Sequence, residues 1–306
     1  MDMYQKRKIR AEKKNMGNEE NLSKVIINHY PGHMAKTKRL IKENLPLIDI
    51  VYEVVDSRIP YSSKITDIDD YTKNKPKIII FTKDDLCDKE ETKKWKEYYQ
   101  KQGNAVISLN LEANVNIKPL ITLTEKIMEE ENKKREAKGL LKRKARILVV
   151  GVPNVGKSTL INRLSLKKVV NTGNKPGITK NISWIRVNDK IELLDTPGIL
   201  WPKLTDRALG LAAFTAIKEE ILPLYDVTEY ILRMLEKYYP NILKERFSLE
   251  YLHDDIIEDL EIIGKKRGCL VSGGEVDYDK VIKVIMNDIK LGYIKGITFD
   301  RYDELN

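Results

Sequence analysis

A glycine-rich segment at residues 151–158 (GVPNVGKS) constrains the fold of this 306-residue chain more than any other feature. It follows an apolar run at residues 146–150 and opens a helical pattern. This spacing is typical of a phosphate-binding loop, because its glycines let backbone N–H groups turn toward phosphates and the helix N-terminus favours an anion. The residues expected to contact phosphates are Asn154, Val155, Gly156, Lys157, Ser158 and Thr159.

Strand and helix signals alternate on both sides of this loop. Short apolar or alternating runs predict strands at residues 48–55, 77–81, 104–109, 146–150, 182–187 and 191–194. Helical patterns lie between them at residues 33–45, 88–102, 117–137 and 157–166. We therefore expect an α/β domain with a mostly parallel sheet and helices on both faces.

After residue 204 the strand signals stop and apolar residues recur at helical spacing. Three helices are expected, near residues 224–238, 252–263 and 277–292, with Gly264 ending the second and Asp277 capping the third. The predicted division is a basic, flexible extension at residues 1–23, the α/β domain at 24–204 and a small all-α domain at 205–306.

Two segments after the phosphate loop predict a metal-dependent phosphate site. Residues 173–179 (GNKPGIT) are rich in backbone breakers, so Pro176, Gly177 and Thr179 are expected to order around a γ-phosphate. The Thr179 hydroxyl would join that of Ser158 on Mg²⁺, and Lys157 would neutralise the β- and γ-phosphates. Asp195 would hold Mg²⁺ through water, and the Gly198 N–H would sense the γ-phosphate.

A base-recognition segment precedes the phosphate loop, at residues 82–85 (TKDD). The Asp85 carboxylate can accept two N–H bonds from guanine, each contributing about 1.5–3 kcal/mol, whereas adenine presents no such donor pair. The Lys83 stem would cover the base plane, beside Thr82. Asn110 and Leu111 follow the next strand, and the Leu111 N–H would reach the guanine carbonyl.

These segments occur in the reverse of the usual order, in which phosphate elements precede base-recognition elements. The chain is therefore predicted to be a circularly permuted GTPase domain of the phosphate-loop class, followed by the all-α domain. Because Asp195 lies shortly before residue 205, we expect this order to couple phosphate sensing to the position of the all-α domain.

The net charge of +9 is unevenly distributed, since residues 205–306 hold 20 acidic and 14 basic side chains. Basic residues concentrate at residues 6–14 and 133–146, which predicts contact with a nucleic-acid phosphate backbone. No apolar run is long enough to span a bilayer. Cys87 and Cys269 lack metal-ligand spacing and indicate reduced thiols. We expect a cytoplasmic protein without membrane contact.

Residues 30–36 (YPGHMAK), 56–60 (DSRIP), 153–162 and 195–202, with the order of the segments, resemble the YlqF-type circularly permuted GTPases. The resemblance covers residue 28 to the end. It implies a GTP-hydrolysing factor that binds a late precursor of the large ribosomal subunit, contacts rRNA and ribosomal proteins, and leaves after hydrolysis. Residues 265–267, with Lys244 and Arg246, are the expected RNA contact in the all-α domain. Away from the ribosome we expect a monomer.

Departures from the usual GTPase pattern concern catalysis and affinity. The family usually has Asn at the position of Thr82, so we expect weaker nucleotide binding with guanine choice retained. Ile199 stands where many GTPases orient water with Gln. His33 alone would be an ordinary surface or capping histidine, but the resemblance implies that it orients the attacking water.

Asn154 leaves two interpretations open. It resembles the asparagine of potassium-activated GTPases, where K⁺ stabilises charge in the transition state, but it can equally satisfy its own loop backbone. Two other functions are also open. One is an rRNA-binding placeholder whose nucleotide is mainly structural, and the other is an ATP-dependent enzyme, which Asp85 disfavours.

Overall fold

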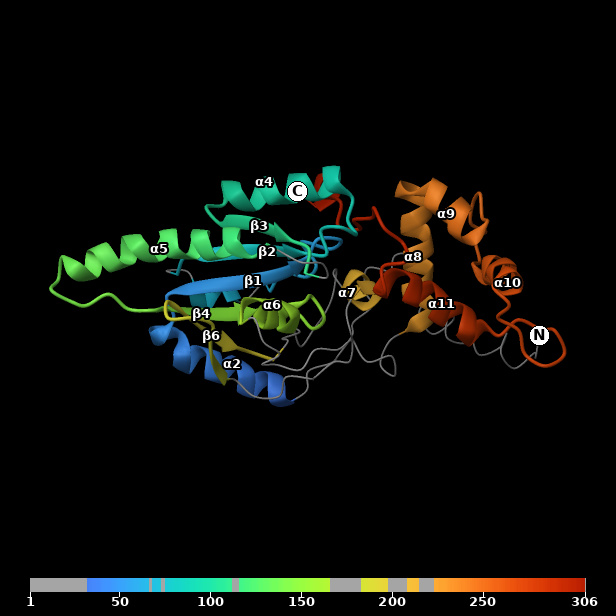
Figure 1. Ribbon diagram of the computed structural model, residues 1–306. Helices are drawn as coiled ribbons and strands as arrows, with labels where there is room; N and C mark the ends of the chain where they lie inside the picture. Colours follow the sequence, from blue (N-terminus) through green and yellow to red (C-terminus); the bar gives the residue numbers. More distant parts are fainter. Residues whose placement is uncertain are drawn as a thin grey trace. The chain divides into compact units, whose positions relative to one another are not determined.

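The computed structural model describes residues 32–65, 68–72, 75–111, 116–165, 183–197, 208–214 and 223–305, so the predicted extension at residues 1–23 lies outside the described part. By its internal contacts the chain forms two units. The sheet unit comprises His29–Pro202 and Asp300–Asn306, and the helical unit includes Lys203–Phe299 (Figure 1). The helical unit is thus joined to the sheet unit at both ends of Lys203–Phe299.

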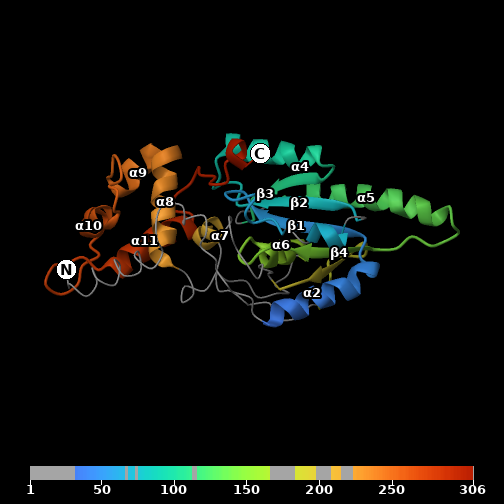
Figure 2. The same ribbon diagram turned by 180° about the vertical axis from the view of Figure 1, so that it is seen from behind.

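The sheet unit contains one six-stranded sheet, in the order β3-β2-β1-β4-β6-β5 (Figures 1 and 2). The strands are β1 (Ile50–Asp56), β2 (Lys77–Thr82), β3 (Ala105–Leu109), β4 (Ala145–Val150), β5 (Ser183–Arg186) and β6 (Ile191–Asp195). All neighbours are parallel except β5, which runs antiparallel to β6. The predicted α/β class and mostly parallel sheet are confirmed.

Helices connect and cover these strands. They are α2 (Gly32–Asn44), the short 3₁₀ helix η2 (Leu45–Leu47), α3 (Ile68–Thr72), α4 (Lys89–Lys101), α5 (Lys118–Glu136) and α6 (Lys157–Leu164). The start of α4 is fixed by Asp88, whose carboxylate accepts hydrogen bonds from the backbone N–H groups of Glu90 and Glu91. Such a cap satisfies donors that have no partner within the helix.

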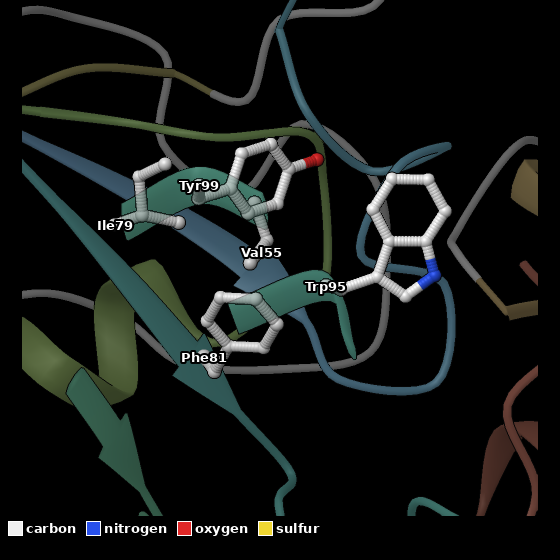
Figure 3. Packing of buried hydrophobic residues seen from close by; sticks show 5 residues of the cluster. All are labelled: Val55, Ile79, Phe81, Trp95 and Tyr99. Atoms are coloured by element: carbon white, nitrogen blue, oxygen red, sulfur yellow. The ribbon is translucent and has the colours of Figure 1, made fainter. Parts of the chain in front are cut away.

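Both faces of the central strand β1 are buried, and different helices cover them. The Tyr52 hydroxyl is hydrogen-bonded to Thr124 of α5. Val55 packs in an apolar cluster with Trp95 and Tyr99 of α4, together with Ile79 and Phe81 of β2 (Figure 3). Side chains an odd number of positions apart in a strand point to opposite faces. Helices α4 and α5 therefore lie on opposite sides of β1, as the sequence predicts.

The carboxyl ends of the parallel strands form one edge of the sheet. Asp56, Thr82, Leu109, Val150 and Asp195 are the last residues of β1, β2, β3, β4 and β6. In open parallel sheets this edge is where ligands bind. The segments that the sequence analysis selected as nucleotide-binding follow β2, β3, β4 and β6, so four of them leave the sheet at the same edge.

The helical unit contains α7 (Ala208–Phe214), α8 (Leu224–Tyr238), α9 (Pro240–Phe247), α10 (Ile257–Lys266) and α11 (Tyr278–Lys290), whereas α12 (Tyr302–Leu305) belongs to the sheet unit. The helical character of the C-terminal region and the Asp277 cap are confirmed, since the Asp277 carboxylate accepts the Lys280 N–H. The short helices α7, α9 and α12 were not predicted. None of the described helices has both the length and the apolar character required to cross a membrane.

Gly264 does not end its helix, because α10 continues to Lys266. A Cβ on Gly264 would lie 2.5 Å from Cγ1 of Val276 and 2.8 Å from Cγ2 of Val281. The prediction of a stop at Gly264 is therefore wrong. Position 264 requires glycine because Val276 and the α11 residue Val281 pack too closely for a Cβ. The turn after the helix instead uses Gly268, whose φ is 66°.

Candidate functional site

The phosphate loop, the base-recognition segment and its companion segment meet in space. A Cβ added to Gly156 would lie 3.2 Å from Cδ1 of Leu111 and 3.5 Å from Cγ2 of Thr82. Leu111 is held there by Arg163 of α6, whose Nε donates to the Leu111 carbonyl at 3.2 Å. Three segments that are far apart in the sequence thus surround the first turn of α6.

The backbone of the phosphate loop requires its glycines. A Cβ on Gly151 would lie 2.6 Å from the carbonyl oxygen of Val54, so only glycine lets the loop pass the end of β1 at this distance. Gly156 has φ 102° and Asn154 has φ 61°, both in the left-handed region that turns backbone N–H groups inward. Ser158 and Thr159 follow in the first turn of α6, both half-buried.

Lys157 is buried and folds back over the loop that contains it. Its Nζ donates to the carbonyl oxygens of Gly151 and Val152, both at 2.8 Å. Burial lowers the pKa of Lys157 to about 8, against the attraction of Asp195. A bound polyphosphate would favour the charged amine, because a nearby negative charge raises the pKa of a lysine.

Asp195 is a buried carboxylate at the end of β6. The residue is 1% exposed, and among the residues that the structure describes neither of its carboxylate oxygens has a partner within hydrogen-bonding geometry. Burial raises the pKa of Asp195 to about 6, while Lys157 and a nearby Thr196 N–H act in the opposite direction. The chain beyond is fixed by the Thr196 hydroxyl, which donates to the Val149 carbonyl at 2.8 Å. Orphaned buried carboxylates of this kind indicate a cation or water that the site is built to bind.

Thr82 joins the base-recognition segment to the phosphate loop. Its hydroxyl lies 2.5 Å from the carbonyl oxygen of Val155 and 3.0 Å from that of Val55, and it can donate to one of them at a time. The threonine therefore braces the loop through its own side chain. The sequence alone does not show this contact, and the weaker nucleotide binding expected from threonine in place of asparagine stays a prediction.

The two adjacent aspartates of the segment have different surroundings. Asp84 is held by Lys96, at 2.8 Å, and by Lys89. Asp85 is exposed and makes no hydrogen bond or ion pair with the residues that the structure describes. Only Asp85 is thus available to accept N–H groups from a base. Lys83 has φ 55°, which turns the chain between Thr82 and these aspartates.

A buried ion cluster below this segment was not recognised as functional from the sequence. Arg58 donates from Nη2 to Asp56 Oδ2 at 2.8 Å, and Lys83 donates from Nζ to the same oxygen at 2.8 Å. Burial alone would raise the pKa of Asp56, but the positive charges of Arg58 and Lys83 outweigh it and hold that pKa well below its usual range. The 56–60 (DSRIP) segment was the available signal, and its role depends on contacts that spacing does not show.

Several predicted site residues lie outside the described part of the chain. Pro176, Gly177, Thr179 and Gly198 are among them. His33 lies in α2, where the backbone is described and the position of its side chain is not. Their predicted roles stay predictions.

Known proteins resemble this chain over most of its length. A family model described as "50S ribosome-binding GTPase" matches residues 146–251, which begin at β4 and leave out the base-recognition segments that precede it. Ribosome biogenesis GTPase A of Bacillus licheniformis is 45% identical over 283 residues, which cover 92% of this chain and 100% of that relative. The chain belongs to the ribosome biogenesis GTPase A family.

More distant members of the ribosome biogenesis GTPase A family align over the same length. The Thermotoga maritima protein is 32% identical over 276 residues, covering 90% of this chain and 95% of the relative. The GNP-bound crystal structure of T. maritima YlqF superposes with a TM-score of 0.63 at 29% identity, over 87% of this chain and 98% of that chain. A GDP-bound YlqF structure gives 0.60 at 28% identity. This chain is therefore a circularly permuted, guanine-nucleotide-binding GTPase.

Proposed function

We propose that the protein is a cytoplasmic assembly factor that binds a late precursor of the large ribosomal subunit in its GTP form and is released after hydrolysis. The relatives' names support the ribosomal role. One observation supports the nucleotide site: Gly156 of the phosphate loop lies against Thr82 and Leu111 of the base-recognition segments. Asp85 follows β2 and Asp195 ends β6, at the same edge of the sheet. Away from the ribosome the protein acts as a monomer.

In this proposal the base and the phosphates bind to opposite ends of the site. Asp85 accepts the two N–H groups of guanine, Lys83 covers the base, and Asn110 and Leu111 close its other edge. The backbone of Asn154, Val155 and Gly156 surrounds the phosphates, with Lys157 turned toward them, and Ser158 and Thr159 lie at the N-terminus of α6. Pro176, Gly177 and Gly198 complete the γ-phosphate side.

The unpartnered Asp195 carboxylate fits a divalent cation, because hard oxygen ligands are what Mg²⁺ prefers. Asp195, Ser158 and Thr179 would hold Mg²⁺, which neutralises phosphate charge. His33 orients the attacking water in the ribosome-bound state. A His33→Ala protein should keep nucleotide binding and lose ribosome-stimulated turnover, and wild-type stimulated turnover in that variant would contradict the assignment.

Potassium is part of the proposal through Asn154 alone. A K⁺ ion held there would add positive charge beside the phosphates. Hydrolysis measured in KCl and in NaCl at equal ionic strength decides between this role and a backbone-capping asparagine. A faster rate in KCl that is lost in Asn154→Ala supports the ion, and equal rates reject it.

Exposed cations on the sheet unit support contact with rRNA. Lys134 of α5 and Lys138 just after it are exposed and have no ion pair among the described residues. The predicted basic cluster of the helical unit is instead largely paired. Lys244 lies 2.7 Å from Glu250, and Arg246 and Arg267 both contact Asp288. We therefore place the stronger phosphate contact near the end of α5.

The decisive experiment is co-sedimentation with free large-subunit particles in the presence of a non-hydrolysable GTP analogue or GDP. A GTP-dependent factor should bind much better with the analogue, because a ligand shifts an equilibrium only by its differential affinity for two states. Equal binding in both would favour a placeholder whose nucleotide is structural. Asp85→Asn is the matched control, since it should weaken binding of GTP and improve binding of XTP, which offers an oxygen in place of the guanine 2-amino group.

A further inference from the structure

The last described residues of the chain, 300–305, here called the C-terminal tail, contact a loop at the end of β1. Asp300 is 4% exposed. Its Oδ2 accepts the backbone N–H groups of Tyr61 and Ser62, both at 2.7 Å, and its Oδ1 accepts the Ser62 hydroxyl at 2.6 Å. These bonds to a carboxylate are charge-assisted and fix the loop at residues 57–65, here called the β1 loop.

The β1 loop is in turn tied to the base-recognition segment. The Asp56 N–H donates to Ser63 Oγ at 3.0 Å, and the Ser57 N–H donates to the Thr82 carbonyl at 3.0 Å. Asp56 also accepts the Lys83 ammonium in the buried ion cluster described above. A short series of contacts therefore leads from Asp300 through the β1 loop to Lys83.

The tail also contacts the helix that follows the base-recognition segment. Trp95 of α4 donates from Nε1 to the Asp300 carbonyl at 2.9 Å, and the Tyr302 N–H donates to Glu91 Oε1 at 2.5 Å. The Tyr302 ring meets the Trp95 ring edge-on, with centroids 5.3 Å apart. Arg301 lies 3.7 Å from Asp88, the residue that caps α4. In both views the C-terminus lies beside α4 (Figures 1 and 2).

We propose that Asp300 is a positioning residue for guanine recognition. Residues 82–87 connect β2 to α4. The tail binds α4 directly and reaches Thr82 and Lys83 through the β1 loop and Asp56, and thereby sets the placement of Lys83 and Asp85. If the tail only covered the aromatic surface of α4, the Tyr302–Trp95 contact would suffice. The Asp300 carboxylate instead binds the β1 loop. This inference rests on the proposed assignment of Asp85 to guanine.

The test compares Asp300→Ala with Asp303→Ala in the full-length protein, by equilibrium binding of GDP and IDP. IDP lacks the 2-amino group, so its base offers Asp85 one N–H group, whereas the guanine of GDP offers two. Substitutions at residues that link two sites without touching the ligand typically change the coupling by about 2- to 30-fold, so Asp300→Ala should weaken GDP binding by a factor in that range. The preference for GDP over IDP should also fall, because that preference requires a correctly placed Asp85.

Two variants separate positioning from general stability. Asp303 is in the same tail and, among the described residues, pairs with the half-exposed Lys94, so Asp303→Ala should keep wild-type affinities. Asp300→Asn should restore most of the GDP preference, because its amide oxygen accepts the two N–H groups and its amide nitrogen can donate to Ser62 Oγ. A purely structural role would lower the melting temperature of Asp300→Ala and leave the GDP-to-IDP ratio of the folded protein unchanged. That result would overturn the proposal.

If Asp300→Ala does not fold, Ser62→Ala carries the same test, since it removes one hydroxyl bond to Asp300 and should reduce the ratio by a smaller factor. An unchanged ratio in folded Ser62→Ala would also overturn the proposal. Asp85→Asn distinguishes a wrong assignment of Asp85 to guanine from a wrong role for Asp300. If it leaves GDP affinity intact, the base assignment itself is wrong. If it weakens GDP binding while Asp300→Ala does not, only the role of Asp300 is wrong.

Discussion

Replacing Asp195 by asparagine should stabilise the nucleotide-free protein while weakening nucleotide binding. The residue is 1% exposed, its carboxylate has no hydrogen-bond partner in the described part of the chain, and burial raises its pKa from 3.8 to about 6. A shift of roughly 2 pKa units corresponds to about 3 kcal/mol of folding free energy lost when the group is ionised. Asparagine resembles the protonated acid in shape and carries no charge. Losing the attraction for Lys157 offsets part of the gain, so we expect about 1–3 kcal/mol.

The size of the stability gain in Asp195→Asn should depend on pH, and this dependence identifies the ionised carboxylate as its cause. A carboxyl group with a raised folded-state pKa contributes stability below its unfolded pKa of 3.8, and that contribution is lost as pH rises through about 6. The stability difference between Asp195→Asn and wild type should therefore be near zero below about pH 4 and reach its plateau above about pH 6. Contributions from the other carboxylates cancel in this difference.

The assay is urea unfolding of the nucleotide-free protein, followed by tryptophan fluorescence, since Trp95 and Trp184 belong to the same sheet unit as Asp195. The same variant should lose Mg²⁺-dependent affinity for a GTP analogue. A lower urea midpoint for Asp195→Asn than for wild type at pH 7.5, with an unchanged m-value, would show that the buried Asp195 carboxylate does not destabilise the nucleotide-free protein. Stability lost to keep a functional group in place is common at active sites.

Three further changes test other parts of the structure. Thr82→Val removes the hydroxyl that braces the phosphate loop, so GDP affinity should fall about 5- to 30-fold, as expected for 1–2 kcal/mol. Titration with fluorescent GDP measures this loss, and Thr82→Ser should restore the affinity. Gly264→Ala places a methyl group against Val276 and should lower the free energy of unfolding by about 1–3 kcal/mol, measured by thermal or urea unfolding. Lys134→Ala with Lys138→Ala should reduce the salt slope of particle binding by about 2, whereas Lys244→Ala, which removes a paired charge, should change it less.

Much of the fold could be predicted because its signals are local. The apolar strands and the glycine spacing at residues 151–158 each occupy a few consecutive residues, and a parallel sheet then brings the segments after its strands to one edge. The short helices α7, α9 and α12 were missed because about one or two turns carry little periodicity. Gly264 was misinterpreted because its neighbour Val276 is distant in sequence, and a close approach of that kind leaves no local pattern.

The sequence predicts which residue types form the candidate site but does not show which contacts hold them in place. The choice of Asp85 over Asp84 followed from spacing, and the pairing of Asp84 with Lys89 and Lys96 supplies a physical reason for it. The support of Lys83 by Asp56 could not be read from spacing, because it depends on the end of β1 lying beside the end of β2. Arg58 and Lys83 offset the cost of burying the Asp56 carboxylate, and these two cations come from different segments.

The chain joins the helical unit to the sheet unit twice, and only the first of these connections can be read from the order of the segments. The sequence places the chain after Asp195, on the phosphate side, just before the helical unit. The structure adds a second connection, since Asp300 returns to the sheet unit and binds Ser62, 238 residues away in sequence. Residues 203–299 are thus connected to the phosphate side at one end and to the base side at the other.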